Sequence, residues 1–363
     1  MPGRVLVAMS GGVDSSVAAA RLARAGHDVI GVTLHLWDYP DDGSVRARCC
    51  APEDLHDARR VADRLGIPHY AFDRRELFAD TIVEPFVEDY LAGRTPSPCV
   101  RCNRGVKLAE LFALADRLGA EQVATGHYAR LREHDGRIEL LRARDPSKDQ
   151  SYFLHWVGQE QLRRLCFPLG DSEKSAVRDE ARALELPGAH KGESQELCFV
   201  PNGRYDAFIE QHAADRLRPG PIVDASGRVV GAHRGVHAFT LGQRKNLGVA
   251  LGERAYVVGI DPESATVRLG PREALEAAAA EVTELALAEG VTLPLRAEVQ
   301  VRYRARPVTA EVRALGTGAI VLFDTKVISV VPGQYAVFYD GDRVLGGGRI
   351  VRSLPTAPTE LPA

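Results

Sequence analysis

AMSGGVDSS, residues 8–16, follows the apolar run Val5 to Ala8 and leads directly into a helical pattern of small apolar residues. Two consecutive glycines between a strand and a helix let backbone N–H groups approach an anion, and the helix N-terminus adds about half a positive charge. The stretch therefore predicts a phosphate-binding loop. It has neither the lysine of G-x-x-x-x-G-K-[ST] nor the spacing of G-x-G-x-x-G, which excludes those two nucleotide motifs.

Apolar runs of β type alternate with helical patterns on both sides of this loop, from Arg4 to about Tyr128. Strands are expected at residues 4–9, 28–36, 69–72 and 121–125, and helices at 15–25, 52–65, 76–91 and 106–118. The alternation predicts the α/β class: a doubly wound parallel sheet, covered by helices, that binds ligands at the carboxyl ends of its strands.

The rest of the chain has a different sequence pattern. Residues 145–200 are expected to extend the first domain, with helices at 159–164 and 173–184. Glycine-rich sequence near Pro219 predicts a small β-rich middle domain. An alanine-rich connector at 274–280 is followed by closely spaced strands, which predict a C-terminal β-barrel with Asp340-Gly341 as a hairpin turn. The expected domains are residues 1–205, 206–274 and 275–363.

The composition limits the partners and the compartment. The formal net charge is −3 over 363 residues, so a nucleic acid would need a local basic patch rather than a global positive field. No apolar run approaches the roughly 20 residues of a membrane helix, and six cysteines are too few for a disulfide scaffold. Because the N-terminus lacks a secretory signal pattern, we expect a cytoplasmic protein with no membrane partner.

Two of the cysteines form a C-x-x-C. GRTPSPCVRCN, residues 93–103, contains Cys99 and Cys102, whereas Cys198 stands in SQELCFV. A C-x-x-C alone fits a metal half-site, a redox pair or chance. The string S-G-G-V-D-S, however, resembles the pyrophosphatase loop of enzymes that adenylate a carbonyl oxygen and release AMP and pyrophosphate. Beside such a loop, one cysteine can carry sulfur while another helps to discharge it.

In combination these motifs resemble the bacterial tRNA-specific 2-thiouridylases, ATP-dependent transferases that replace the C2 oxygen of a wobble uridine with sulfur. The resemblance covers nearly the whole chain and includes AMSGGVDSS, LHLWD, GRTPSPCVRCN, ATGHYAR, KDQSYFL, SQELCFV, FTLGQRKNLG and PGQYAVFYDGDRVLGGGRI. It implies a first domain of the adenine nucleotide alpha-hydrolase (PP-loop) type, followed by the β-rich middle domain and the barrel.

The resemblance also implies a role for each matching residue. Cys102 corresponds to the nucleophile of the family and Cys198 to its persulfide carrier. ATP contacts correspond to Ala8, Met9, Ser10, Gly11, Gly12, Val13, Asp14, Ser15, Leu34 and Gly126. tRNA contacts correspond to Ser97, Pro98, Cys99, Lys148, Asp149, Gln150, Arg302 and Tyr303. The implied reagents are ATP with Mg²⁺, tRNA, and a cysteine desulfurase or sulfur-relay protein that loads Cys198.

Two positions depart from the family pattern. One branch of the family has an aspartate, assigned to acid-base work, where this chain has Cys99. Asn246 stands where the family usually has glycine, and asparagine is among the few other residues that tolerate a positive φ. Near the C-x-x-C, Arg101, Arg104 and Lys107 supply positive charge that is expected to lower the thiol pKa and to meet phosphates.

Three alternatives stay open at this stage. Cys99, Cys102 and Cys198 would leave one iron of a [4Fe-4S] cluster open if they were its three ligands. A synthetase of the same loop class acting on a small metabolite would need neither Cys102 nor Cys198. A tRNA-binding sulfur carrier would need no ATP chemistry, and the intact loop disfavours it.

Overall fold

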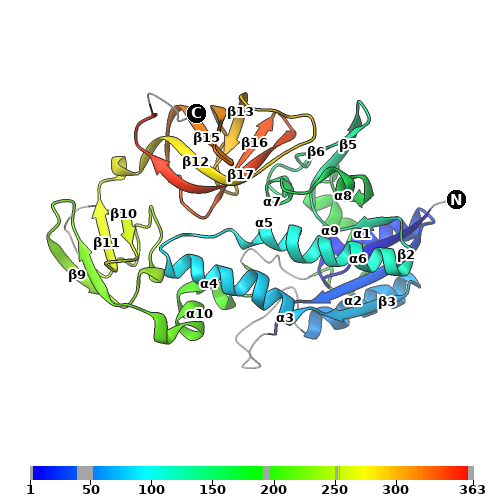
Figure 1. Cartoon of the computed structure of the whole chain (residues 1–363). Helices are drawn as coiled ribbons and strands as arrows, with labels where there is room; N and C mark the ends of the chain where they lie inside the picture. The colour runs from blue at the N-terminus through cyan, green and yellow to red at the C-terminus, as the bar shows by residue number, and fades with distance from the viewer. Residues whose placement is uncertain (1–2, 39–51, 191–196, 250–251, 253, 359–363) are drawn as a thin grey trace. The chain divides into compact units, whose positions relative to one another are not determined.

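The computed structural model describes residues 3–38, 52–190, 197–249, 252 and 254–358 (Figure 1). The chain divides into two compact units. The first unit comprises Met1–Val83, Cys99–Arg204 and Asp342–Val344, and the second comprises Glu84–Pro98, Tyr205–Gly341 and Leu345–Ala363. The segment directly before the C-x-x-C therefore belongs to the second unit. The expected boundaries at 205/206 and 274/275 stay a prediction.

The first unit contains a five-stranded sheet in the order β3-β2-β1-β4-β7, and every neighbouring pair is parallel. Its strands are β1 (Arg4–Ala8), β2 (Asp28–His35), β3 (His69–Asp73), β4 (Gln122–Ala124) and β7 (Leu165–Cys166). The chain winds outward from β1 to β3 and then returns to the other side of β1 for β4. This reversal between β1 and β4 is the point at which doubly wound sheets bind ligands. The predicted fold class is confirmed.

Helices cover the sheet of the first unit. They are α1 (Val13–Arg24), α2 (Pro52–Leu65), α3 (Arg75–Phe78), α5 (Pro98–Cys102), α6 (Ala109–Leu118), α7 (Ser151–Leu154), α8 (Gln159–Arg164) and α9 (Lys174–Ala183). The core beneath α1 consists of small and β-branched side chains: Val17 and Ala18 of α1 pack with Val61 of α2 and Val177 of α9, all fully buried. Small residues on α1 allow both neighbouring helices to approach it closely.

The helix expected at residues 76–91 is confirmed as a continuous helical segment, but it is not a regular α-helix throughout. The structure has α3, a π-helical turn η1 (Ala79–Val83) and then α4 (Glu84–Leu91), which belongs to the second unit. Pro85 has no N–H to donate, and the change of helix type directly before α4 places it in the first turn of that helix, where proline is tolerated. A second π-helical stretch, η2 (Asn103–Leu108), joins α5 to α6, and such irregular turns often occur at functional sites.

One hairpin of the first unit was not predicted. Strands β5 (Arg130–His134) and β6 (Arg137–Leu141) pair antiparallel across a two-residue turn. Asp135 and Gly136 both have positive φ, 51° and 72°, as such tight turns require. The Asp-Gly dipeptide is the sequence signal that identifies this hairpin.

The second unit contains a four-stranded sheet in the order β10-β11-β8-β9, which confirms the β-rich middle region. Its strands are β8 (Gly220–Val223), β9 (Val229–His233), β10 (Tyr256–Asp261) and β11 (Thr266–Gly270). Short helices accompany it: α10 (Tyr205–His212), η4 (Ala214–Arg216), η5 (Val236–Ala238) and η6 (Arg272–Leu275). Ile222, Val257 and Val267 are fully buried in its core, together with Phe239 and Leu247 from the connecting segment.

A closed β-barrel of the second unit uses six of the described strands. They are β12 (Glu276–Leu287), β13 (Leu295–Gln300), β14 (Val308–Leu315), β15 (Gly318–Ile328), β16 (Tyr335–Asp340) and β17 (Arg343–Leu354), and β12 pairs with both β15 and β17 to close the ring. The predicted barrel is confirmed, but the connector expected at 274–280 is wrong, because β12 begins there. Ala277, Ala279 and Ala280 are buried, so packing inside a closed barrel overrides the helical preference of alanine.

Candidate functional site

The glycine-rich loop lies at the carboxyl end of β1, and two glycines permit the close approaches around it. Gly11 has a φ of 72°, and a Cβ there would collide with the backbone of Asp54. A Cβ on Gly126, which follows β4, would lie 2.8 Å from Ser15 N and 3.0 Å from Asp14 C. The structure thus brings Gly126 onto the N-terminus of α1, at the switch point of the sheet.

Hydroxyl groups fix the shape of the loop. Ser15 Oγ accepts a hydrogen bond from Ser10 N at 3.1 Å and lies 3.1 Å from Gly12 O, to which it donates. Ser16 Oγ donates to the same carbonyl at 2.8 Å. These serines hold the loop from within, so its backbone N–H groups remain arranged around the helix N-terminus, where an anion is favoured.

The end of β2 supports the other side of the loop. Met9 N donates to Val32 O at 2.8 Å, and the buried Thr33 hydroxyl donates to Met9 O at 2.6 Å. Leu34 follows on β2 and is half-buried. The predicted ATP-binding residues therefore come together at one edge of the sheet, from the loop after β1, the end of β2 and the segment after β4.

A lysine that the sequence analysis did not single out lies at this loop. Lys174 Nζ contacts the two carboxylate oxygens of Asp14 at 2.6 and 2.7 Å, and the Tyr128 hydroxyl donates to Asp14 Oδ1 at 2.8 Å. The Lys174 side chain is 11% exposed and that of Asp14 34%. The site thus contains an ammonium group that is almost enclosed, at the N-terminus of a helix suited to phosphate.

The loop before α7 connects to the same network. Gln150 exchanges two hydrogen bonds with the Tyr128 backbone, at 2.8 and 2.9 Å, and Asp145 Oδ2 accepts from Lys174 N at 3.1 Å. The segment that contains Lys148 therefore contacts both residues that hold Asp14.

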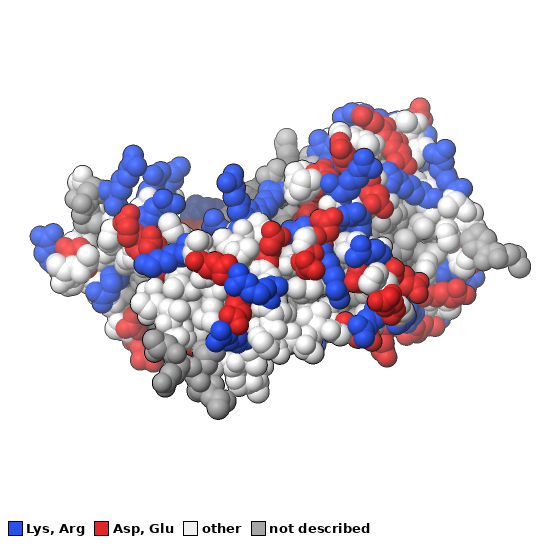
Figure 2. All heavy atoms as spheres, turned by 90° about the horizontal axis from the view of Figure 1, so that it is seen from above, with Lys and Arg blue, Asp and Glu red and all other residues white. Residues whose placement is uncertain are grey.

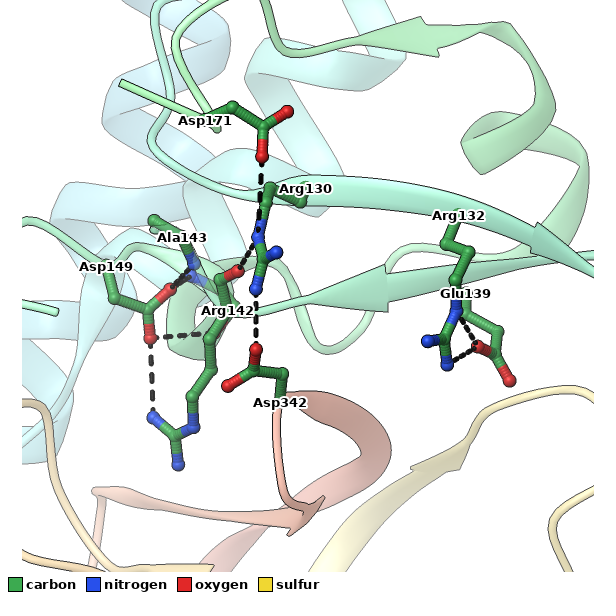
Figure 3. Close-up of polar contacts among 9 residues, drawn as sticks. Arg130, Arg132, Glu139, Arg142, Ala143, Asp149, Asp171 and Asp342 are labelled. Atoms are coloured by element: carbon green, nitrogen blue, oxygen red, sulfur yellow. Dashed lines mark hydrogen bonds and ion pairs between the residues drawn. The ribbon is translucent and has the colours of Figure 1, made fainter. Parts of the chain in front are cut away.

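Asp149 is buried, and Figure 3 shows its contacts with Ala143 and Arg142. Its Oδ1 accepts from Ala143 N at 2.9 Å and from Ser151 N at 3.1 Å, and its Oδ2 lies 3.4 Å from Arg142 Nη1. Nearby, Arg130 pairs with Asp342 at 2.6 Å and ties the hairpin to the start of β17. These contacts give Asp149 a structural role in shaping the loop; the predicted tRNA contact at this position stays a prediction.

The two C-x-x-C thiols lie on α5, with Cys99 half-buried and Cys102 only 4% exposed. Burial raises the pKa of both thiols, that of Cys102 to about 11, and Lys107 opposes the rise at each. Burial and the same ammonium lower the pKa of His127 to about 3, so this imidazole is neutral. Lys107 is thus the cation that acts on all three groups.

The expectation that flanking charge lowers the pKa of Cys102 is wrong for the net effect, because desolvation outweighs Lys107. Arg104 is turned elsewhere: its guanidinium lies 4.0 Å from the centre of the Trp156 ring. At rest the nucleophile predicted from the sequence is therefore a thiol and not a thiolate.

Cys198 is half-buried in the segment Leu197–Val200, and Phe199 anchors that segment. The Phe199 ring lies 5.6 Å from Phe78 and 6.2 Å from Trp37, in edge-to-face contacts. No disulfide joins Cys99, Cys102, Cys166 or Cys198. In the described parts of the chain no three His, Cys, Asp or Glu side chains form a group suited to a metal ion, so the [4Fe-4S] alternative is not supported.

Arg302 and Tyr303 belong to the second unit, in the turn after β13. Arg302 is exposed, and Gln300 Nε2 donates to its carbonyl at 3.2 Å. Arg304, at a φ of 62°, stacks on Tyr303 at 5.2 Å. Ser97 and Pro98 are also in the second unit, next to Cys99 of the first. Among the described helices, none combines the length and the apolar character that a bilayer crossing requires.

A parallel sheet with a serine- and glycine-held anion loop at its switch point defines a nucleotide-binding enzyme of the PP-loop class. The sequence matches the families described as "tRNA methyl transferase HUP domain" over residues 3–202, "tRNA methyl transferase PRC-barrel domain" over 206–271 and "Aminomethyltransferase beta-barrel domain" over 278–350. The chain belongs to the tRNA-specific 2-thiouridylase family.

Relatives match it over almost its whole length. The tRNA-specific 2-thiouridylase MnmA of Sorangium cellulosum (strain So ce56) is 63% identical, with 97% of this chain and 93% of the relative covered. That of Geotalea uraniireducens (strain Rf4) is 46% identical, with 97% and 96% covered. A crystal structure of a 4-thiouridine synthetase–RNA complex with bound ATP aligns with 59% of this chain and 51% of that chain, at a TM-score of 0.37 and 15% identity.

Proposed function

We propose that this protein is a cytoplasmic, ATP-dependent tRNA-uridine 2-sulfurtransferase that thiolates the wobble uridine. The observation that carries the proposal is the loop at residues 8–15 beside Gly126, at the switch point of the sheet. Family membership favours this function over a synthetase acting on a small metabolite, because the relatives are named as tRNA thiouridylases.

The first step transfers AMP from ATP to the uracil C2 oxygen and releases pyrophosphate. The loop N–H groups and the Lys174 ammonium stabilise negative charge on the phosphates, and Leu34 lies at the sheet edge against the adenine. Mg²⁺ fits the oxygen donor that Asp14 provides; when bound beside the phosphates it would neutralise part of their charge.

In the second step, sulfur replaces the adenylated oxygen. A desulfurase or relay protein leaves a persulfide on Cys198, and its outer sulfur attacks C2, so that AMP departs with the oxygen. Cys102 then attacks Sγ of Cys198, the bond between that atom and the transferred sulfur breaks, and a Cys102–Cys198 disulfide remains for an external thiol to reduce. Lys148, Gln150, Arg302 and Tyr303 contact the tRNA.

The adenylation step is tested by product analysis. Incubation with ATP, Mg²⁺ and unmodified tRNA is expected to yield AMP and pyrophosphate, and Asp14→Ala is expected to abolish both. Asp179→Ala, which removes an exposed carboxylate of α9 that pairs with Arg182 at 2.9 Å, serves as the matched control and is expected to remain active. ADP and phosphate as products would refute the proposal.

The thiols are tested with labelled sulfur from a cysteine desulfurase. Cys198→Ser is expected to accept no label, whereas Cys102→Ser is expected to accept it and fail to pass it to tRNA. Cys99→Ser tests the cluster alternative, because a three-thiolate cluster loses its iron with any ligand. An iron-containing protein whose Cys99→Ser variant is inactive and iron-depleted would overturn the persulfide route.

A further inference from the structure

The motif FTLGQRKNLG, residues 239–248, has no role in the function proposed above. Its two ends are fixed: Phe239 and Leu247 are both buried in the core of the middle sheet. Arg244, Lys245 and Asn246 between them are exposed. Residues Gln243–Leu247, the basic turn, therefore project two adjacent cations from an anchored segment.

The basic turn is braced from within. Gln243 Oε1 accepts from Thr240 N at 3.0 Å, and its Nε2 donates to Lys245 O at 3.1 Å. The backbone of Gln243 also accepts from Val257 N at 2.9 Å. Asn246 has a φ of 59°, the conformation that makes glycine usual at this position. Because the turn is already ordered, a ligand that binds it loses little conformational entropy.

The turn also lies in a strongly basic part of an acidic protein. Residues 217–254 contain six Lys or Arg and two Asp or Glu, although the whole chain has a net charge of −3. One of the two acidic residues, Asp224, forms an ion pair with Arg228 at 3.0 Å and accepts a hydrogen bond from Ser226 N. Within the described ranges, the basic side chains without an ion-pair partner here are Arg218, Arg234, Arg244, Lys245 and Arg254, all exposed, and Arg218 donates to the carbonyl of Glu263 at 3.1 Å.

Arg234 lies on the same part of the second unit as the basic turn. It directly follows β9, and a side chain at Gly231 of β9 would collide with Val249, two residues beyond the turn. In Figure 2, Lys and Arg side chains are visible in the left-hand part of the view, where Figure 1 draws β9, β10 and β11, and others are spread over the rest of this face. Some basic residues of the barrel differ, because Arg352 pairs with Glu281 and Lys326 with Glu276.

We propose that the basic turn, together with Arg234, binds phosphates of the tRNA backbone. This inference rests on the proposed function, which supplies an RNA substrate. Unpaired cations on an ordered turn suit a polyanion, and arginine can contact a phosphate through two N–H groups at once. In a protein of negative net charge, RNA affinity depends on such local patches.

The test replaces both cations of the turn, in Arg244→Gln/Lys245→Gln, and measures the Kd for unmodified tRNA from low to high salt. Each lost phosphate contact removes about 0.7–0.9 from the slope of log Kd against log salt, so the slope is expected to fall by about 1.5. At about 100 mM salt the Kd is expected to rise about tenfold or more. The Kd for ATP and the rate of AMP formation at saturating tRNA are expected to stay unchanged.

The matched control, Lys326→Gln/Arg352→Gln, removes the same charge from cations that are already paired, and its Kd for tRNA is expected to change less than twofold. A further variant, Gln243→Ala, keeps both cations and removes the brace, and an intermediate loss of affinity is expected.

Three outcomes would overturn the inference. The first is an unchanged Kd and slope in a variant of an otherwise active enzyme. The second is an equal loss in the control variant, which would show an effect of total charge. The third is normal tRNA binding with loss of sulfur acceptance from the desulfurase, which would assign the turn to a protein partner. A wild-type protein that binds no tRNA would instead refute the proposed function itself.

Discussion

Variants of the Asp14–Lys174 ion pair can separate its contribution to the stability of the protein from its contribution to the rate of AMP formation. Lys174→Met keeps most of the apolar stem and removes the ammonium that contacts both Asp14 oxygens. Asp14→Asn removes the opposite charge and keeps a partner for the Tyr128 hydroxyl. The double variant contains neither charge.

The magnitudes follow from the geometry. A hydrogen bond to a charged group contributes about 1.5–3 kcal/mol to the free energy of unfolding. The Asp14 side chain is 34% exposed and keeps the Tyr128 hydroxyl at 2.8 Å, so the loss in Lys174→Met belongs at the lower end of that range. For a domain of about 200 residues this lowers Tm by about 3–8 °C. In the double variant we expect a loss smaller than the sum of the single losses by about 1–2 kcal/mol.

Activity is expected to behave differently. Lys174 contributes to catalysis only if it also stabilises the phosphates, and loss of one such group costs about 100-fold in rate. The rate of AMP formation is therefore expected to fall about 100-fold in Lys174→Met and to remain low in the double variant, whose stability recovers.

The assay combines thermal unfolding with single-turnover formation of AMP in all four proteins of the cycle. Arg182→Met, which removes an exposed cation of the same helix, is the control and is expected to change Tm by less than 2 °C. Strictly additive losses of stability would refute direct coupling between Asp14 and Lys174. A full rate of AMP formation in the Lys174→Met single variant, despite its lower Tm, would show that Lys174 has only a structural role.

Three further predictions follow from the described contacts. The rate at which iodoacetamide alkylates Cys102, followed by peptide mass spectrometry, is expected to rise with pH up to about pH 11. Lys107→Met is expected to lower that rate at every pH below 11. A rate that reaches its plateau below pH 9 would contradict this prediction. Burial lowers the pKa of His155 to about 4, below its ordinary 6.5, so its contribution to stability is complete above pH 6.5 and is lost as the pH falls towards 4. At pH 5 the loss in the free energy of unfolding is about 2 kcal/mol. His155→Gln is therefore expected to narrow the difference in Tm between pH 7 and pH 5. An unaltered difference in Tm would exclude His155 as the group responsible. Arg302→Gln is expected to weaken tRNA binding several-fold and to lower the salt slope by about 1 while the Kd for ATP is kept, and an unaltered slope would remove this residue from the interface.

The sheet and its loop could be predicted from the sequence because each depends on short-range patterns. The α2 helix has the predicted bounds, residues 52–65, and the loop glycines stand between the apolar residues of β1 and the first turn of α1. Strand β12 was not recognised, since alanine favours helices and only closure of the barrel gives small residues a reason to form a strand. Local preference decides an element only where packing does not oppose it.

The parts of the candidate site that were missed depend on contacts between distant segments. Lys174 and Asp14 are 160 residues apart, and nothing near Lys174 in the sequence marks it as different from other lysines of exposed helices. Gly126 was found only through the family resemblance, and its close approach to Ser15 N supplies the physical reason for a glycine. A motif locates the groups that lie within it, whereas groups that complete the site from elsewhere require the fold.

The surroundings of Cys102 show why local charge in a sequence cannot be converted directly into a pKa. In a regular α-helix, the residue five positions after Cys102 would lie about 140° around the axis and point away from it. The π-helical stretch Asn103–Leu108 joins residues five apart through its hydrogen bonds, which returns Lys107 towards the side of the thiols, while Arg104 stacks on Trp156. Desolvation of the buried Cys102 still exceeds the effect of that one ammonium. The motif therefore identifies the cysteine. The π-helical turn determines which cation lies near the Cys102 thiol, and burial keeps that thiol protonated at rest.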